Sequence, residues 1–446
     1  MVERIKAVAG ARFALFVLFA INLLNFFDRQ LLGSLGEPIR KEFHLSDTAL
    51  GLLGTVFVIV YAVVGLPLGQ LSDKWRRTRL IAVSIAVWSL LTAVTGLAQN
   101  YAQIFVARLG VGLGEAACAP AGQSLIGDYF ASGRRTFAMG VFMLGLPAGV
   151  FAAYATAGWI ATHFGWRAVF YVACVPGLIF ALLALFMREP ARDSLDSDRA
   201  GAALPTSPRS AFACVLSLPT MWWIILSGIF HNFNMYAINS FNTPLLQRYH
   251  HMSLSAASNA SSIAVGAVGA IGLLAGGLLA DRMSAKRRNG RLVLAALCMS
   301  VAAPCIYFAI NQPPGSITAY VILMALATIT MYVYYATVYA AIQDVIEPRL
   351  RGIAVAIYFC GMYIFGASLG PVGTGILSDH FAHKAMLSAG ASQMTEAFKA
   401  TGLHDAMYAT PILAVAAALV LFAASRTLEK DARKQETAAR PMPTLA

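Results

Sequence analysis

Charged residues are scarce in this sequence. Asp, Glu, Lys and Arg make up 12% of its 446 residues, and hydrophobic residues make up 58%. Soluble domains carry about 25% charged residues, which they need to cover a surface in contact with water. The composition therefore excludes an ordinary soluble protein and indicates a chain that lies largely within a membrane.

Several motifs that carry chemistry are also absent. The chain has no GxxxxGK(S/T) phosphate loop, which argues against an ATP-driven pump, and no HExxH motif of a metalloprotease. Its six cysteines show no CxxC spacing, so we expect neither a disulfide nor a metal site. We therefore expect no enzyme activity and no cofactor.

Long apolar runs dominate what is present. Runs of about 20 apolar residues are long enough to cross the hydrocarbon of a bilayer. We expect twelve membrane-spanning helices, at residues 12–34, 48–70, 79–98, 102–126, 136–161, 168–187, 217–246, 256–280, 292–310, 317–341, 352–377 and 406–425. The first run has no cleavage site and is expected to remain as helix 1. Residues 378–405 are expected to form a long outer loop.

The basic residues are distributed unequally between the two sides. With twelve spans, 25 Lys and Arg fall on the side of the two termini and six fall on the other side. This asymmetry follows the positive-inside rule, so we expect both termini in the cytoplasm and the chain in the plasma (inner) membrane. The net charge of +12 is thereby explained without nucleic acid, which we do not expect as a partner.

The chain divides into two halves with related loops. The segment 188–211 is rich in Pro, Ser, Asp and Arg, as in a flexible linker. Sequence echoes support an internal repeat: Arg135 and Ala138 match Arg351 and Ala354 at an offset of 216. The expected organisation is a six-helix bundle at 1–187, a cytoplasmic linker at 188–211, a second six-helix bundle at 212–425 and a cytoplasmic tail at 426–446. Paired halves of this kind often build alternating access around a central site.

Four charged residues lie inside the predicted spans. Asp28 and Arg29 are on helix 1, and Arg108 and Glu115 are seven residues apart on helix 4, on one helix face. Charges in a membrane are costly and need partners, so we expect the two acids to pair with the two arginines, in either arrangement. Glu115 is the first candidate for a proton carrier and Asp28 the second, whereas Arg29 and Arg108 are charge partners and candidates to bind a substrate head group. A permanent structural ion pair is the alternative.

Helix 7 and the tyrosines of helices 10 and 11 suggest a polar and aromatic cavity. Helix 7 has too many polar residues to face lipid. The residues that we expect to line a substrate cavity are Asn25, His231, Asn232, Tyr236, Asn239, Tyr335 and Tyr358. A tyrosine-rich wall suits a substrate with an apolar body and a polar end. His231 could equally be a hydrogen-bonded core residue.

The loops and the charged helices together resemble a known family. GQLSDKWRRTR from Gly69 and GLLADRMSAKRR from Gly277, in two sets of six spans, resemble the signature loop of the major facilitator superfamily. INLLNFFDR from Ile21 and RLGVGLGEAACAPAGQSLIGDYF from Arg108 resemble its spinster-like branch, whose animal members are linked to sphingolipid and lysophospholipid export. Organic anion:cation symporters share the charged pairs of helices 1 and 4.

The resemblance implies a secondary active transporter with the major facilitator fold. It would move lipid-like or amphiphilic organic substrates across the lipid bilayer by alternating access, with proton coupling, and we expect a monomer. An organic-anion/proton symporter and a multidrug exporter are the alternatives. The resemblance also implies a gate formed by Asp73, Arg77, Asp128 and Arg135, although a basic loop that only sets topology would look the same. Substrate identity, direction and stoichiometry do not follow from the sequence.

Overall fold

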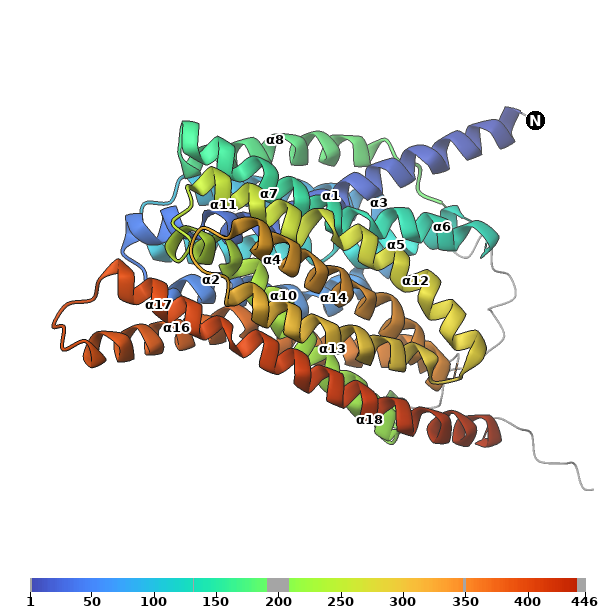
Figure 1. Cartoon of the computed structure of the whole chain (residues 1–446). Helices are drawn as coiled ribbons and strands as arrows, with labels where there is room; N and C mark the ends of the chain where they lie inside the picture. Colours follow the sequence, from blue (N-terminus) through green and yellow to red (C-terminus); the bar gives the residue numbers. More distant parts are fainter. Residues whose placement is uncertain (1, 131, 191–207, 348–349, 439–446) are drawn as a thin grey trace, which may run out of the picture.

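The computed structural model is a bundle of helices that run alongside one another (Figure 1). It describes residues 2–130, 132–190, 208–347 and 350–438. Within these ranges every regular element is a helix, so the all-α prediction is confirmed. Most of the expected linker, residues 191–207, lies outside the described residues, as does the end of the expected tail, residues 439–446.

Helices of the two halves follow one another in chain order. The first half contains α1 (Val2–Phe43), α2 (Asp47–Lys74), α3 (Arg77–Gly96), α4 (Tyr101–Glu115), α5 (Cys118–Tyr129), α6 (Ser132–Met143), α7 (Gly145–Phe164) and α8 (Trp166–Leu185). The second half contains α9 (Pro208–Leu216), α10 (Pro219–Arg248), α11 (Leu254–Ser261), α12 (Gly269–Lys286), α13 (Gly290–Ile310), α14 (Ile317–Val345), α15 (Arg351–Gly361), α16 (Leu369–Ser388), α17 (Glu396–Met407) and α18 (Ala409–Ala438). Two π-helical turns, Ser262–Ala267 and Met362–Ala367, join α11 to α12 and α15 to α16.

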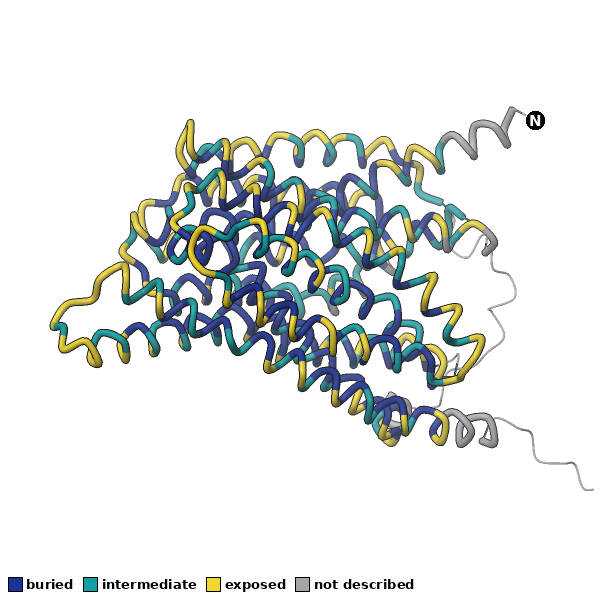
Figure 2. The backbone as a smooth tube through the Cα atoms, in the orientation of Figure 1, coloured by how far each residue is buried: buried dark blue, intermediate teal, exposed yellow. Residues whose placement is uncertain are grey.

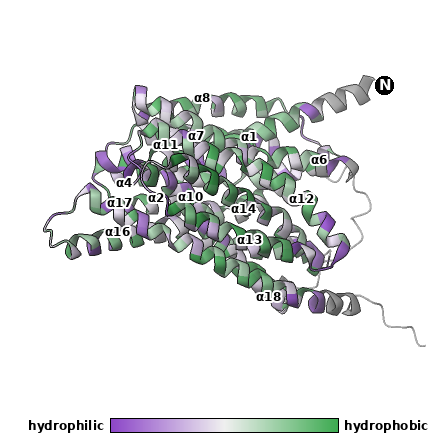
Figure 3. Cartoon of the chain, in the orientation of Figure 1, coloured by the Kyte–Doolittle hydropathy of each residue, from purple (hydrophilic) through white to green (hydrophobic). Residues whose placement is uncertain are grey.

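Twelve helical spans account for the described chain, as predicted. Eleven segments are long and apolar enough to cross a membrane, and several of them contain two helices in succession, such as α4 with α5. The twelfth span is α10, which is 30 residues long but carries too many polar side chains to qualify by hydropathy. Hydrophilic residues gather toward the two ends of the bundle, and hydrophobic ones cover its middle (Figure 3).

The expected outer loop at 378–405 is mostly helical, so that prediction is wrong. α16 continues to Ser388, and α17 begins at Glu396 behind Thr395, whose hydroxyl accepts a hydrogen bond from the Phe398 N–H. α17 packs against α16 and buries Leu403 there. A hydropathy window misses such a segment because it registers long apolar runs, whereas this helix is only 12 residues long and carries Glu396, Lys399 and Asp405. α18 likewise continues as a helix to Ala438.

The internal repeat reappears as matching contacts. The Arg135 guanidinium donates to the Gly127 carbonyl oxygen at 2.9 Å, and the Arg351 guanidinium donates to the Gln343 carbonyl oxygen at 3.1 Å. Both pairs are related by the offset of 216 that the sequence indicated. The two bundles are therefore pseudo-symmetric in structure as well as in sequence.

Each half has its own apolar interior. Buried residues follow the facing sides of the helices, while exposed ones lie along the outside of the bundle and in the connections (Figure 2). The first half buries Trp88 and Phe170 in separate clusters, and the second half buries a larger cluster around Phe241, Met299 and Tyr334. The outer, exposed faces are rich in Leu, Val, Ile and Phe, as expected where lipid replaces water.

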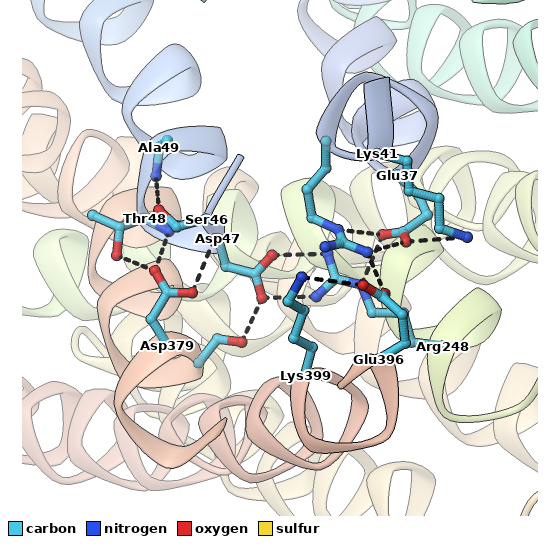
Figure 4. Close-up of polar contacts among 12 residues, drawn as sticks. Glu37, Lys41, Ser46, Asp47, Thr48, Ala49, Arg248, Asp379, Glu396 and Lys399 are labelled. Carbon is cyan, nitrogen blue, oxygen red and sulfur yellow. Dashed lines mark hydrogen bonds and ion pairs between the residues drawn. The ribbon is translucent and has the colours of Figure 1, made fainter. Parts of the chain in front are cut away.

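The two halves are joined by buried ion pairs at the end of the bundle opposite the chain termini, here called the far end (Figures 1 and 4). Arg248 at the end of α10 donates to both carboxylate oxygens of Asp47, at 2.7 and 2.8 Å, and to Glu37 at 2.7 Å. Arg40 donates to Glu37 at 2.7 Å and also contacts Glu396 of α17. The side chains of Arg248 and Asp47 are only 3% and 4% exposed, so this network is shielded from solvent.

A second junction at the far end is a helix cap supplied by the other half (Figure 4). The first backbone N–H groups of a helix have no partner within it. In α2 those of Asp47 and Thr48 donate to the carboxylate of Asp379, on α16, at 3.0 and 2.9 Å. The Thr48 hydroxyl donates to the same carboxylate at 2.6 Å. α2 is therefore completed by a residue of the second half.

Glycines allow α2 and α16 to approach closely. A Cβ atom on Gly51 would lie 2.3 Å from the Pro371 carbonyl oxygen, and one on Gly375 would lie 2.3 Å from the Asp47 carbonyl oxygen. Neither position has room for a side chain without moving the backbone. The far end is consequently sealed by ion pairs, a cap and direct backbone packing.

Removing the charge of Arg248 should loosen the far end. Arg248→Gln leaves Asp47 and Glu37 buried without their shared cation, and breaking a buried pair in this way costs about 3–5 kcal/mol. Amide hydrogen exchange in the first turn of α2 should therefore accelerate by at least about tenfold, since about 1.4 kcal/mol corresponds to a factor of ten. Mass spectrometry of the purified protein measures this exchange.

Lys399→Gln is the matched control. Lys399 pairs with Glu396 at the same end, but the two side chains are 33% and 58% exposed, and such surface pairs contribute about 0–1 kcal/mol. Exchange in α2 should remain close to that of the unaltered protein. Equal acceleration in both variants would show that the buried network does not hold the far end closed.

Candidate functional site

A pocket lies between the two halves. Residues of α1, α2 and α4 line it from the first half, and residues of α10 and α16 line it from the second half. Its cavity volume is about 40 Å³, so the space between the halves is narrow. Its lining consists of Arg29, Gln30, Leu32, Gly33, Leu50, Gly54, Phe57, Val58, Arg108, Tyr236, Asn239, Ser240 and Pro371. The site thus combines two arginines, uncharged polar groups and apolar walls.

Arg29 and Glu115 form a buried ion pair beside this pocket. The Arg29 Nε atom lies 3.0 Å from Glu115 Oε2, and the two side chains are 3% and 0% exposed. Asn25, one helical turn before Arg29, donates its amide N–H to the same carboxylate oxygen at 2.9 Å. One of the two expected acid–base pairs is therefore present, and it joins α1 to α4.

Asp28 faces away from its sequence neighbour, toward α3. It is 2% exposed, and its carboxylate accepts a hydrogen bond of 3.2 Å from the Thr92 hydroxyl. No ion pair within 4.0 Å joins it to Arg108 in the described chain. The expected second pair is thus incorrect as a direct contact, because the angle of about 100° between adjacent helix positions turns Asp28 into the first-half bundle.

Arg108 is held by an aromatic ring instead of a carboxylate. Its guanidinium carbon lies 4.8 Å from the centroid of the Phe57 ring, and the side chain is 1% exposed. The guanidinium carbon of Arg29 lies 5.2 Å from the centroid of the same Phe57 ring and 4.2 Å from the centroid of the Tyr61 ring. Cation–π contacts of this kind stabilise an arginine without neutralising it.

Several nitrogen atoms of the two arginines have no hydrogen-bond acceptor. Among the described residues, both Nη atoms of Arg29 and the Nε atom of Arg108 are buried without a partner, as is Glu115 Oε1. Buried polar groups are nearly always satisfied, so these atoms need a partner from outside the chain, either water or a bound molecule. Positive charge and free N–H groups suit an anionic group.

Acids and arginines occupy different layers of the site. Arg29 and Arg108 belong to the pocket lining, whereas Asp28 and Glu115 do not. The acids therefore lie behind the arginines as viewed from the pocket. An anion that enters the pocket would compete with Glu115 for Arg29.

The predicted cavity residues are only partly brought together. Tyr236 and Asn239 line the pocket. Asn25 does not, and it contacts Glu115, the partner of the lining residue Arg29. His231 is fully buried within the second half, where its ring stacks on Tyr334 with centroids 3.9 Å apart.

The remaining predicted cavity residues contact one another behind the pocket. The Tyr335 hydroxyl donates to the Asn232 side-chain oxygen at 3.3 Å, and Tyr358 is fully buried, with its hydroxyl 3.1 Å from that of Tyr334. Most polar residues of α10 thus bond neighbouring helices. For this reason the helix lines the pocket with one short stretch rather than along its length.

The predicted gate residues lie at the end of the bundle that carries the termini. Arg77, 2% exposed, binds Asp128 and donates to Glu189 at 2.9 Å, all within the first half. Burial opposes ionisation of Glu189, but hydrogen bonds from Thr78 and Arg77 outweigh it and hold its pKa below the ordinary value. Arg135 contacts the end of α5, and the side chain of Asp73 lies outside what the structure describes.

The second half repeats this arrangement. Arg291 at the start of α13 binds Asp344 near the end of α14, as Arg77 at the start of α3 binds Asp128 near the end of α5. The sequence analysis missed this counterpart, although Asp128 and Asp344 are also separated by 216 residues. It also missed the far-end network, since Glu37, Asp47 and Arg248 appear in the sequence as ordinary charges near the ends of spans.

Comparison with known proteins connects this architecture to a family. A family model of the Major Facilitator Superfamily matches residues 18–371. An MFS-type efflux pump of Mycolicibacterium smegmatis is 30% identical over 364 residues, covering 81% of this chain and 83% of the pump. Protein spinster homolog 3 of Mus musculus is 26% identical over 388 residues, covering 81% of this chain and 74% of that protein.

A solved structure agrees in fold. The crystal structure of a bacterial homolog of the human lysosomal transporter spinster, in an inward-facing and unoccupied conformation, superposes with a TM-score of 0.82. The two chains are 28% identical, and the match covers 95% of this chain and 98% of the other. The sequence resemblance to spinster-like proteins is thereby confirmed. The chain belongs to the Major Facilitator Superfamily and is a multi-pass membrane transporter related to the spinster proteins.

Proposed function

We propose that this transporter moves amphiphilic organic substrates with an anionic head by alternating access, coupled to protons. The observation that carries the proposal is the pocket between the halves, which is lined by two buried arginines with N–H groups that have no acceptor among the described residues. An anionic head would bind Arg29 and Arg108. The tail would lie against apolar lining residues such as Leu32, Leu50 and Val58.

Names of related proteins support a lipid-like substrate. Besides the mouse spinster homolog, a probable sphingolipid transporter, spinster homolog 1 of Arabidopsis thaliana, is 26% identical over 407 residues. Sphingolipid-like molecules combine a polar head with an apolar chain. This chemistry fits a site with arginines on one side and apolar walls on the other.

Proton coupling would follow from the position of the two acids next to the arginines that line the pocket. Glu115 shares Arg29 with any anion that enters the pocket, so substrate binding would weaken the ion pair and favour protonation of the carboxylate. Loss of the substrate would restore the pair and release the proton. Asp28, which is buried and accepts a hydrogen bond from the Thr92 hydroxyl, would be the second proton carrier.

The sealed far end supports an assignment of the conformation. With the termini in the cytoplasm, as the charge asymmetry favours, the far end is the outer side and the described state faces inward. Arg77, Asp128 and Arg135, together with Asp73, would join the halves when the inner side closes. We propose a monomer in the plasma (inner) membrane as the working unit.

A compact organic anion is the second candidate substrate. Two arginines in a confined pocket favour a small anion as well as a lipid head. The hexuronate transporter of Bacillus subtilis and the cis,cis-muconate transport protein of Acinetobacter baylyi are 26% and 27% identical to this chain. A multidrug exporter, suggested by the mycobacterial efflux pump, would use the same apolar walls with less dependence on the arginines.

Replacing Glu115 should uncouple transport from protons. Glu115→Gln keeps a hydrogen-bonding side chain of the same size next to Asn25 and Arg29 but removes the titratable group. In proteoliposomes containing a pH dye, addition of single-chain phospholipid should no longer drive proton movement. Exchange of labelled substrate across the membrane should persist, since exchange needs no net proton transfer.

Glu42→Gln is the control, because Glu42 is a 40% exposed acid near the far end of the bundle. Proton flux should be unchanged in that variant. Flux driven only by small hydrophilic anions would favour the second candidate substrate. Substrate movement without any proton flux in the unaltered protein would exclude coupling through Glu115.

Replacing Arg108 should weaken anion binding. A hydrogen bond to a charged group contributes about 1.5–3 kcal/mol, so Arg108→Gln should raise the Kd for an anionic amphiphile by about tenfold or more. Isothermal titration with the purified protein measures this change. Arg167→Gln, at a 35% exposed arginine away from the pocket, should leave Kd unchanged. An unaltered Kd in Arg108→Gln would remove Arg108 from the site.

A further inference from the structure

Asn239 is a buried polar residue of the pocket whose role the arginines do not explain. It lies on α10, is 8% exposed and belongs to the pocket lining. Its side-chain Oδ1 atom is buried and has no hydrogen-bond partner among the described residues. An amide left in this state is costly unless a ligand completes its hydrogen bonds.

The backbone of Asn239 is held firmly in place by the first half. Its carbonyl oxygen accepts a hydrogen bond from the Tyr154 hydroxyl, and Gly33 of α1 approaches that oxygen so closely that an added Cβ would lie 2.2 Å away. The backbone is therefore fixed by contacts that the side chain does not use. The amide group is left available to the pocket.

Neighbouring polar groups share this part of the pocket. Tyr236 and Ser240 lie on the same side of α10, one turn before and one residue after Asn239, and both line the pocket. These groups are uncharged, whereas the first half contributes Arg29 and Arg108. The two halves thus offer different chemistry to one ligand: positive charge from the first and neutral hydrogen-bonding groups from the second.

We infer that Asn239 is a specificity-determining residue that selects anionic substrates with a hydroxyl group next to the charged group. The inference rests on the proposed function, because it takes Arg29 and Arg108 to hold the anion. The hydroxyl group of the substrate donates to the Asn239 amide oxygen. A site built to bond a hydroxyl group rejects an analogue that lacks it, because its own buried group then stays unpaired.

Two kinds of molecule carry this chemistry, and matched pairs of ligands distinguish them. A lysolipid head is represented by 1-oleoyl-glycerol-3-phosphate and its analogue without the free hydroxyl group. A free hydroxy acid is represented by gluconate and hexanoate, which have six carbons each. Titration calorimetry of the full-length protein in detergent gives Kd for all four.

The unaltered protein should bind the hydroxylated member of at least one pair about tenfold more tightly than the other member. Asn239→Leu, which has a similar size but no polar group, should remove this preference. It should weaken binding of the hydroxylated ligand while leaving the other ligand unaffected. Asn239→Ala, whose shorter side chain fits without strain and has no polar group, should do the same and serves if the leucine variant does not fold.

Asn311→Leu is the matched control, since Asn311 lies beyond the end of α13, outside the pocket. The Asn311→Leu variant should prefer the hydroxylated ligand to the same degree as the unaltered protein. The inference is overturned if the unaltered protein binds both members of each pair equally, or if the preference survives in both Asn239 variants. Failure of the proposed function would give a different result. In that case no anion would bind, or the Arg108→Gln variant would bind the anion as tightly as the unaltered protein.

Discussion

The buried pair of Arg29 and Glu115 is the interaction on which the site depends. Charges inside an apolar bundle are costly, and a single ionised partner without the other would be more costly still. The pair joins α1 to α4 next to the pocket, with Asn25 as a third contact. Because Arg29 retains N–H groups without an acceptor among the described residues, the pair that stabilises the first half also leaves donors for the proposed anion. Arg29 therefore contributes both to the stability of the first half and to the proposed binding of an anion.

Much of this arrangement could be predicted from sequence because two rules hold for nearly all membrane proteins: spans are long apolar runs, and charged residues within spans are rare and functional. Apolar runs located the spans, and isolated charges within them located the site. The partners of the charged residues could not be predicted, since they depend on how α1 is rotated in the bundle, which turns Asp28 toward Thr92 of α3. α10 illustrates the same limit: its polar residues indicated a cavity, but most of them bond neighbouring helices, as Asn234 does with the Thr410 carbonyl oxygen at 2.9 Å.

The ion pairs of the far end could not be predicted from the sequence for a different reason. Glu37, Asp47 and Arg248 stand near the ends of spans, where charge is ordinary, and the contacts of Arg248 with Asp47 join residues 201 positions apart. Position near a span end carries no information about a partner in the other half. The stretch 378–405 shows a similar limit, since a short helix with charged residues that packs on another helix lacks the apolar run that identifies a span.

The cap that Asp379 places on α2 has a consequence for how the far end separates. When α16 moves away, the N–H groups of Asp47 and Thr48 lose their acceptor and must find another. Water is the only abundant replacement, so the first turn of α2 becomes hydrated as the halves part. The reverse movement must expel that water before the carboxylate returns. In the proposed alternating-access cycle, this helix end would therefore be hydrated and dehydrated once in each passage.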